Sequence, residues 1–275
     1  MNIVGLGKAG CAIVDKFAQY PQYKIFKIDV DVQGPNSYNI EKQNTPEEYE
    51  ANCPDLTSFF GDIQGETWVV IGGAGYISGM SLSLMEQIGE CDINVLYIKP
   101  EISLLSYNKT LQERLVYMIL QEYARSGVLK CLYIVSNPVI EEILGEVPII
   151  GYWDKLNDII VSTIHMINVF KNSLPVMGRL EEPGTTYRIG TFGLFDEEKS
   201  EEKMFFSLDN TRELCYIYSI NDKRLKSEGT LFKRITSQIK QKSKQENLTV
   251  SYGIYPTTYD QDYTYCLAYT PVIQQ

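Results

Sequence analysis

The first half of the sequence alternates short apolar runs with helical stretches, and no other feature constrains the fold as strongly. Strands are expected over residues 1–4, 23–29, 68–71, 93–98 and 131–136, and helices are expected to begin near Gly10, Gly79, Leu105 and Val139. Strands that alternate with helices form βαβ units, which build a parallel sheet with helices on both faces. Ligands of such sheets bind beyond the carboxyl ends of the strands, so we expect a site in the loops that follow them.

The second half has a different pattern. Apolar residues recur near the helical period over 154–172, which predicts a long helix. Strands rich in tyrosine and β-branched residues are expected at 186–195, 202–209, 213–220, 248–256 and 263–272, with one helix at 229–244. Strands grouped around one or two helices are typical of an α+β domain. The acidic run at 196–203 is expected to be a solvated loop.

We therefore expect an α/β protein in three parts. These are a Rossmann-like nucleotide-binding domain over 1–153, a central helix over 154–173 and a smaller C-terminal α+β domain over 174–275.

Charge and composition exclude several classes of protein. Acidic residues outnumber basic ones by 35 to 25, and the net charge of −10 repels nucleic-acid phosphates, so no nucleic-acid partner is expected. No apolar run reaches the ~18 residues of a membrane span, and the N-terminus has no signal-peptide pattern. We therefore expect a cytoplasmic protein with no membrane partner.

The six cysteines are scattered without a CxxC pair, and His165 is the single histidine. Neither a zinc site nor a disulfide framework is expected from this pattern. We expect reduced thiols, several of them in the core, and a packing or hydrogen-bonding role for His165.

Residues 5–14, GLGKAGCAIV, form a first glycine loop between an expected strand and an expected helix. Gly5, Gly7 and Gly10 satisfy G-x-G-x-x-G, and Asp29 and Asp31 follow about 20 residues later, as in a dinucleotide-binding fold. An NAD(P)-dependent oxidoreductase is therefore one hypothesis, and plain packing of a strand against a helix is another.

Residues 72–79, GGAGYISG, form a second glycine loop after another expected strand. A dinucleotide fold needs only one phosphate loop. Two helix N-termini that converge on one ligand suit a triphosphate, because each adds free amides and a partial positive charge. The fold then supplies the positive field that the acidic composition lacks.

These segments resemble, in the same order, the tubulin/FtsZ superfamily of filament-forming GTPases. The first loop is similar to the family's first nucleotide loop, and the second falls where the family has G-G-G-T-G-T-G. Further similar segments are IDVDVQ at 28–33, NVLYIKP at 94–100, IVSNPVIEEILG at 134–145, YWDKLNDII at 152–160 and the final strands over 247–272. The resemblance covers most of the chain and implies a compact, divergent member, either a paralogue or a phage-encoded relative.

The resemblance implies a guanine nucleotide held by both glycine loops and by the start of the central helix. The implied GTP- or GDP-binding residues are Gly5, Gly7, Lys8, Ala9, Gly10, Cys11, Asp31, Gly73, Ala74, Gly75, Tyr76, Ser78, Gly79, Trp153, Asn157 and Asp158. Asp31 is also implied to hold Mg²⁺ through water, the alternative being that it only ends a strand.

Recognition of guanine has a chemical basis in these residues. Guanine presents two adjacent N–H donors that one carboxylate can accept, whereas adenine has no such pair. Asp158 is the expected acceptor, Asn157 a neighbouring contact and Trp153 an aromatic wall for the base. The alternative is that Asp154, Asn157 and Asp158 cap the central helix.

The sequence departs from the family in the loops. Tyr76 and Ile77 replace the first threonine of the signature and the glycine after it. If that glycine position needs a positive φ, a β-branched residue is disfavoured and the loop follows a different path. Leu104 and Asn108 stand where the family has a glutamate and an arginine. Thr45, in a shortened loop, either donates a hydroxyl to the phosphates or belongs to a surface turn.

In this family the loop after the central helix enters the next subunit's site, where one Asn and two Asp position water and a cation. Here that loop is LPVMGRLEEPG, and the three positions fall on Gly178, Leu180 and Pro183. The neighbouring Glu181 and Glu182 are the candidate catalytic residues, and exposed loop acids are the alternative. Misplaced carboxylates slow phosphoryl transfer, because positioning supplies most of its catalysis.

We therefore expect a guanine-nucleotide-binding protein that stacks head to tail into filaments and hydrolyses GTP slowly, as a polymer. Head-to-tail contacts are heterologous and propagate. Adaptor partners are not identified by the sequence. A nucleotide-free structural relative and an oxidoreductase remain alternatives.

Overall fold

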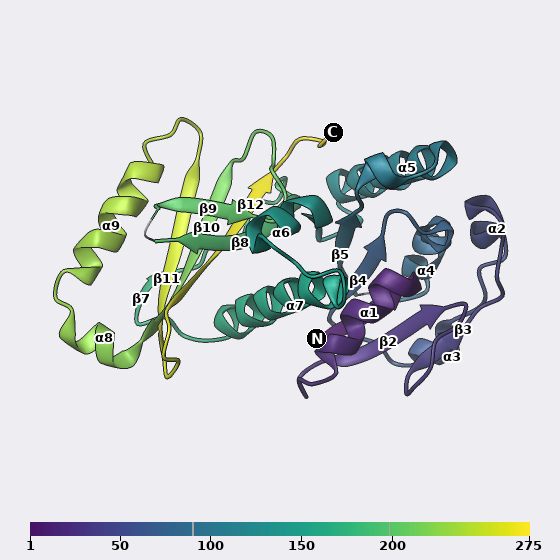
Figure 1. The fold of residues 1–275 in the computed structure, drawn as a ribbon, viewed down its shortest axis with the longest axis horizontal. Coiled ribbons are helices and arrows are strands. Elements are labelled where there is room, and N and C mark those ends of the chain that lie inside the picture. The colour runs from purple at the N-terminus through teal and green to yellow at the C-terminus, as the bar shows by residue number, and fades with distance from the viewer. Residues whose placement is uncertain (90, 198) are drawn as a thin grey trace. The chain divides into compact units, whose positions relative to one another are not determined.

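The computed structural model describes residues 1–89, 91–197 and 199–275, and its elements are labelled in Figure 1. The chain divides into two compact units, Met1–Val161 and Ser162–Gln275. The boundary falls inside the longest apolar-periodic segment, helix α7 (Tyr152–Lys171).

The first unit is built on a parallel sheet. In spatial order its strands are β3 (Ser37–Asn39), β2 (Lys24–Asp29), β1 (Asn2–Leu6), β4 (Glu66–Gly72), β5 (Asp92–Lys99) and β6 (Cys131–Ser136). Every pairing among them is parallel. The five strands predicted here are present, with ends within two residues of those expected, so the predicted α/β architecture is confirmed.

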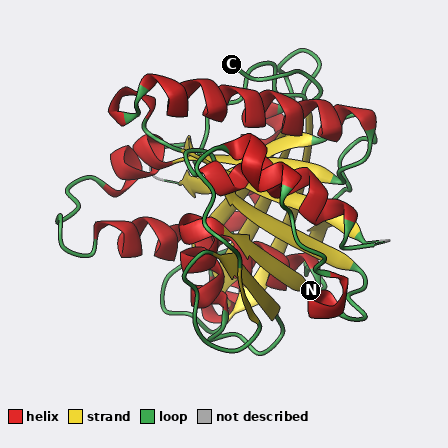
Figure 2. Ribbon diagram, turned by 90° about the vertical axis from the view of Figure 1, so that its right-hand side faces the viewer, coloured by secondary structure: helices red, strands yellow, loops and turns green. Residues whose placement is uncertain are grey.

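Helices accompany the strands of this sheet, as Figure 2 shows. They are α1 (Gly7–Phe17), α2 (Pro46–Ala51), α3 (Thr57–Phe60), α4 (Ser81–Glu86), α5 (Tyr107–Ser126) and α6 (Asn137–Leu144), with short 3₁₀ turns η1 (Tyr76–Met80) and η2 (Ile102–Leu104). Helix α1 packs against β1, β2 and β4, because its buried face carries Ile13, Val14 and Phe17.

The segment around Thr45 opens a helix that the sequence did not predict. The Thr45 hydroxyl accepts a hydrogen bond from the Glu48 amide at 3.2 Å, and Pro46 occupies the first turn of α2. A threonine cap followed by proline is a helix-start signal, but the helix is only one and a half turns long and has no apolar periodicity to reveal it.

The second unit is a mixed sheet with helices. Its strands lie in the order β9 (Glu201–Met204), β8 (Ile189–Asp196), β12 (Tyr263–Thr270), β10 (Glu213–Asn221), β11 (Thr249–Thr257) and β7 (Met177–Arg179). The β10–β11 pair is parallel and the other pairs are antiparallel. The helices are α8 (Asp222–Ser227) and α9 (Leu231–Lys242), and α9 places Leu231, Ile235 and Ile239 in the core. Their four-residue spacing puts all three on one face of the helix.

The acidic run at 196–203 is not simply a solvated loop, so that prediction is wrong in part. Its ends belong to β8 and β9, while Glu198 lies outside the described residues. Glu202 accepts a hydrogen bond of 2.5 Å from the Tyr216 hydroxyl and lies 2.6 Å from Lys242 Nζ. A buried tyrosine and a lysine of the same unit therefore hold this carboxylate in place.

All six cysteines are free, and Cys11, Cys131, Cys215 and Cys266 are buried. Among the described helices, none combines the length and apolarity needed to cross a bilayer.

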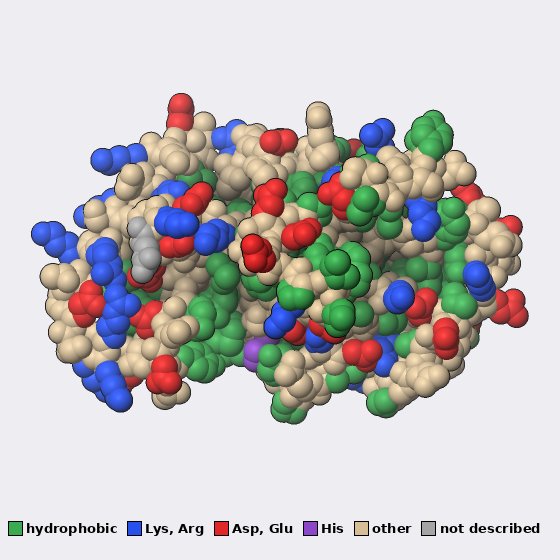
Figure 3. All heavy atoms as spheres, viewed as in Figure 1, with side chains coloured by type: hydrophobic (Ala, Val, Ile, Leu, Met, Phe, Trp, Pro, Cys, Tyr) green, Lys and Arg blue, Asp and Glu red, His purple; other side chains and the backbone are tan. Residues whose placement is uncertain are grey.

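His165 offers a clean test of packing, because it is the chain's only histidine and its side chain reaches the surface in Figure 3. Burial lowers its pKa below the ordinary 6.5. Below 6.5 the unfolded chain therefore binds more protons than the folded one, and this group's contribution to stability falls as pH falls towards the folded pKa. We expect a single imidazole proton signal in NMR titrating below pH 6.5.

The control is His165→Gln, which should lose less stability than the parent protein between pH 7 and pH 5.5, a window of about 1.5 units that includes the ordinary imidazole pKa. A titration midpoint at or above 6.5 would contradict the packing assigned to this residue.

Candidate nucleotide site

A cavity of about 580 Å³ lies at the carboxyl ends of the first unit's strands, and both glycine loops line it. Gly7, Lys8 and Ala9 come from the first loop, and residues 72–75 come from the second. Its volume falls within the range of small-molecule sites, about 300–1,000 Å³. The two loops therefore meet at one place.

Gly7 begins helix α1 and faces the cavity. Its φ is +71°, a conformation that favours glycine, and the residue before it, Leu6, makes no side-chain cap. The first-turn amides of α1 are thus left without a side-chain acceptor. Free amides and the positive end of the helix dipole suit an anion such as a phosphate.

Three predicted residues of the first loop lie beneath the cavity instead of lining it. A Cβ on Gly5 would lie 2.7 Å from the Gly10 carbonyl carbon, and one on Gly10 would lie 2.4 Å from the Val70 carbonyl oxygen. Cys11 is buried beside them, and burial raises the pKa of its thiol to about 12. These residues let the helix approach the sheet closely.

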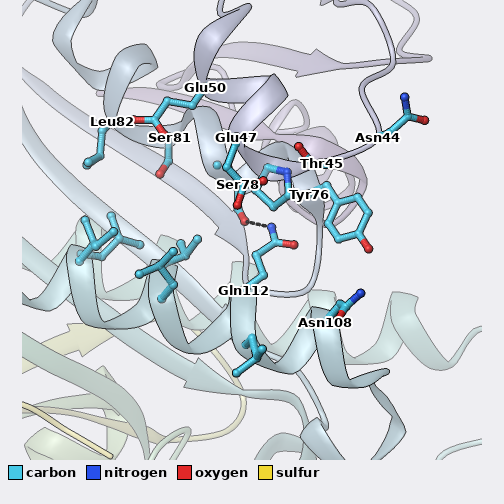
Figure 4. A pocket seen from close by; sticks show the side chains of 17 residues that line it. Asn44, Thr45, Glu47, Glu50, Tyr76, Ser78, Ser81, Leu82, Asn108 and Gln112 are labelled. Atoms are coloured by element: carbon cyan, nitrogen blue, oxygen red, sulfur yellow. Dashed lines mark hydrogen bonds between the residues drawn. The ribbon is translucent and has the colours of Figure 1, made fainter.

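The second loop sends successive residues to opposite sides. Gly73, Ala74, Gly75 and Ile77 line the cavity described above, whereas Tyr76, Ser78 and Gly79 line a separate cavity against α5 (Figure 4). The Ser78 hydroxyl donates to the Gly75 carbonyl at 2.7 Å. That hydroxyl is therefore engaged inside its own loop.

Ile77 occupies space above the first loop. It lies in the 3₁₀ turn η1 and is not among the described residues with positive φ, so the loop takes a helical path there. A Cβ on Gly7 would lie 2.6 Å from Ile77 Cγ2. The isoleucine side chain thus packs directly on the glycine that opens α1.

The start of α7 contributes Trp153 and Asn157 to the cavity lining, but not Asp158. Asp158 Oδ1 lies 2.7 Å from Lys16 Nζ in the last turn of α1, and Asp154 lies 3.4 Å from the same nitrogen. Consecutive helical residues point about 100° apart, and here Asn157 is the one of the pair that lines the cavity. The carboxylate expected to meet guanine instead pairs with a lysine.

Lys109 and Asn137 also line the cavity, and the sequence analysis missed both. Lys109, on α5, is the neighbour of Asn108, which lines the second cavity. The resemblance places Asn108 where the family has an arginine, whereas the residue that lines the cavity is one position further along the helix. Asp31 is exposed and does not belong to the lining. Within the described residues, no group of three or more histidine, cysteine or acidic side chains could hold a metal.

No protein family and no curated sequence matches the chain. Among solved structures, TubZ of Bacillus thuringiensis serovar israelensis, in a GTPγS-form protofilament, superposes with a TM-score of 0.75 at 14% identity, covering 98% of this chain and 86% of that one. CetZ1 from Haloferax volcanii, a GDP-bound monomer, gives 0.71 at 15% identity, covering 98% and 94%. An empty FtsZ dimer from M. jannaschii gives 0.68 at 11% identity, covering 98% and 87%.

The chain has the tubulin/FtsZ fold. The predicted fold class is therefore confirmed over nearly the whole length.

In this tubulin/FtsZ fold a buried polar network supports the second glycine loop. The Tyr97 hydroxyl donates to Glu113 Oε1 at 3.1 Å, and Lys99 Nζ lies 3.7 Å from the same oxygen and 3.8 Å from the ring centroid of Tyr117. Burial raises the pKa of Tyr97 and lowers that of Lys99. A Cβ on Gly73 would lie 2.2 Å from the Tyr97 oxygen, so the loop rests directly on this network.

The candidate catalytic residues Glu181 and Glu182 lie in the second unit, exposed at a small cavity of about 200 Å³. Glu181 Oε1 is 3.9 Å from Arg179 Nε. The segment before them forms β7, which the sequence analysis took for loop. Gly178 within β7 has φ +78°, and a Cβ there would lie 2.3 Å from the Tyr252 carbonyl oxygen. No side chain fits at that position.

The buried network of Tyr97, Glu113 and Lys99 should contribute to the free energy of unfolding. Glu113→Ala removes the partner of the mostly buried Lys99 and the acceptor of Tyr97, so we expect a loss of about 3 kcal/mol in the free energy of unfolding. Urea unfolding monitored by circular dichroism measures it.

Glu122→Ala is the matched control on the same helix, because Glu122 forms an exposed ion pair with Arg125. Its cost should stay within about 0.5 kcal/mol. Equal costs for the two variants would mean that the buried network does not stabilise the unit.

Proposed function

We propose that this chain is a cytoskeletal protein of the tubulin/FtsZ type that binds a guanine nucleotide and assembles head to tail in the cytoplasm. The observation that carries the proposal is the convergence of both glycine loops and the start of α7 on one cavity. Solved proteins of the same fold include a GTPγS form and a GDP-bound form.

The phosphates would lie at the start of α1. Uncapped amides there, together with Lys8 and Lys109 in the lining, offset the repulsion expected from a chain of net charge −10. Mg²⁺ would accompany the phosphates as their counterion. Asp31 lies outside the lining, so we assign it contact with the ion through water only.

The base would pack against Trp153 and meet Asn157, which line the cavity. An amide carries one acceptor and one donor edge and can pair with guanine or with adenine, so Asn157 alone gives little selectivity. Asp158 gives selectivity for guanine if it leaves Lys16, because a carboxylate accepts both guanine donors. We therefore assign binding to Asn157 and discrimination to Asp158.

Self-association is supported by exposed apolar side chains in each unit. Ile149 and Ile150, before α7, are each 94% exposed, and Leu174 and Val176, after α7, are 92% and 58% exposed. Exposed apolar clusters mark interaction surfaces. TubZ of the same fold is described in protofilaments and in two- and four-stranded filaments.

Hydrolysis is proposed to be slow. Position 178 accepts no side chain, so the polar group that the family has there is missing. The acids that follow nearest along the chain are Glu181 and Glu182, both exposed. We assign these two the positioning of water at a neighbouring subunit's nucleotide.

A second candidate function follows from Ile77. Its side chain packs on Gly7, where a phosphate would approach α1, and a chain that has lost its nucleotide could keep the fold for assembly alone.

Nucleotide extraction separates these functions. We expect chromatography of denatured, freshly purified protein to yield guanine nucleotide, and Ile77→Gly to bind GTP more tightly than the parent, because the substitution clears the space above Gly7. Absence of nucleotide, with GTP-independent assembly in light scattering, would favour the nucleotide-free relative. A nicotinamide cofactor in the extract would establish the oxidoreductase alternative instead.

Base recognition gives a separate prediction. Asp158→Ala should lower the preference for GTP over ATP by at least about tenfold, because it removes the acceptor of both guanine donors and even one lost charged hydrogen bond has an effect of that size, while Asn157→Ala weakens both nucleotides alike. Asp154→Ala is the matched control, because it also removes a partner of Lys16 without changing the base contact. Unchanged selectivity in Asp158→Ala would remove this residue from the site.

A further inference from the structure

A second cavity, of about 470 Å³, lies on the other side of the second glycine loop (Figure 4). Helix α2, the turn η1 with the start of α4, and helix α5 enclose it. Its apolar wall consists of Leu82, Leu111, Leu115, Val116, Ile119 and Leu120.

The cavity contains a buried acceptor without a partner. Gln112 is 7% exposed, and its Nε2 donates to the Gly75 carbonyl at 2.9 Å and to Ser78 Oγ at 3.2 Å. Turning the amide over would set its oxygen against the carbonyl oxygen of Gly75, so the orientation is fixed. Gln112 Oε1 has no hydrogen-bond partner. Figure 4 shows this oxygen turned away from Ser78, on the side of Tyr76.

The charged side chains that line this cavity are all acidic. Glu47 and Glu50 are exposed on α2, and neither forms an ion pair within the described residues. No lysine or arginine is among the residues that line this cavity. A ligand that fits the apolar wall, the unpaired acceptor of Gln112 and the acidic rim has an apolar body and a positively charged end that donates hydrogen bonds.

We propose that this cavity binds a small amphipathic organic amine in its protonated form. The ammonium group donates to Gln112 Oε1 and lies in the field of Glu47 and Glu50, while the apolar body packs on α5. Buried acceptors are normally satisfied, and charged donors make the strongest hydrogen bonds with them.

Binding of an amine in this cavity also affects the candidate nucleotide site. This second half of the inference rests on the proposed function. Gln112 holds the carbonyl of Gly75, and Gly75 lines the candidate nucleotide cavity. Tyr76 and Ile77 are adjacent residues on opposite sides of the same loop. An amine that fixes Tyr76 and Gln112 therefore changes nucleotide affinity, and nucleotide changes amine affinity by the same factor.

Three probes with similar bodies and different heads test the site by isothermal titration calorimetry on nucleotide-free protein. Phenethylammonium should bind more tightly than phenethyl alcohol by about tenfold, and hydrocinnamate should bind weakest. Equal affinity for the three, or no binding of phenethylammonium at millimolar concentration, overturns the proposal.

Substitutions in the cavity lining test which residues contact the charged head and which contact the apolar body of the probes. Replacing both rim acids, Glu47→Gln with Glu50→Gln, should reduce the preference for the ammonium probe and leave the affinity for the alcohol unaffected. Leu115→Asn, at a residue 56% exposed, should weaken both probes. Glu122→Gln, an exposed acid on α5 outside the lining, is the matched control and should change neither. An undiminished preference in the double variant overturns the proposal.

The competing occupant is a second copy of the chain packed over the exposed leucines of α5. A concentration-dependent dimer in sedimentation that Leu115→Asn disperses, without amine binding, would overturn the small-ligand site. Failure of nucleotide binding leaves the amine titrations interpretable, because they are measured without nucleotide.

Discussion

The close approach of α1 to the strands beneath it is the contact on which the first unit depends. Gly5 and Gly10 bring backbone against backbone, since a Cβ on Gly10 would collide with the carbonyl oxygen of Val70 in β4. This approach sets where α1 begins, and hence where its free amides point. Because β4 continues directly into the second glycine loop, the same contact also places that loop beside the first.

The second glycine loop is a wall shared by two cavities. Gly72, Gly73, Gly75 and Ile77 face one side, and Tyr76, Ser78 and Gly79 face the other. The two bulky residues that look out of place in a phosphate loop thus have different surroundings. Ile77 fills space over α1, whereas Tyr76 belongs to a cavity with helix α5. Below them, Tyr97, Glu113 and Lys99 form a polar floor.

Periodicity and glycine spacing were sufficient to predict the sheet, the long helices and the fold class, because these elements bury continuous apolar faces. Elements of three to six residues, such as β7 and α2, carry too few apolar positions for a period to be read. In the candidate site, the glycine loops could be found from their spacing, and Trp153 and Asn157 from the resemblance of their segment to the family. The choice of Asn157 over Asp158, and of Lys109 over Asn108, depends on helical phase, which an alignment by resemblance does not fix to one residue. Pairing of Lys16 with Asp158 joins residues 142 positions apart and has no local signal.

The glycine in β7 also limits how this chain can evolve. Gly178 sits against the backbone of Tyr252 with φ +78°, so a polar residue cannot be gained there by changing one codon. Such a gain would require β7 to separate from β11, breaking the pairs of Met177 with Ile254 and of Arg179 with Tyr252. A polar side chain in this part of the chain must therefore come from another position, such as the residues that follow β7.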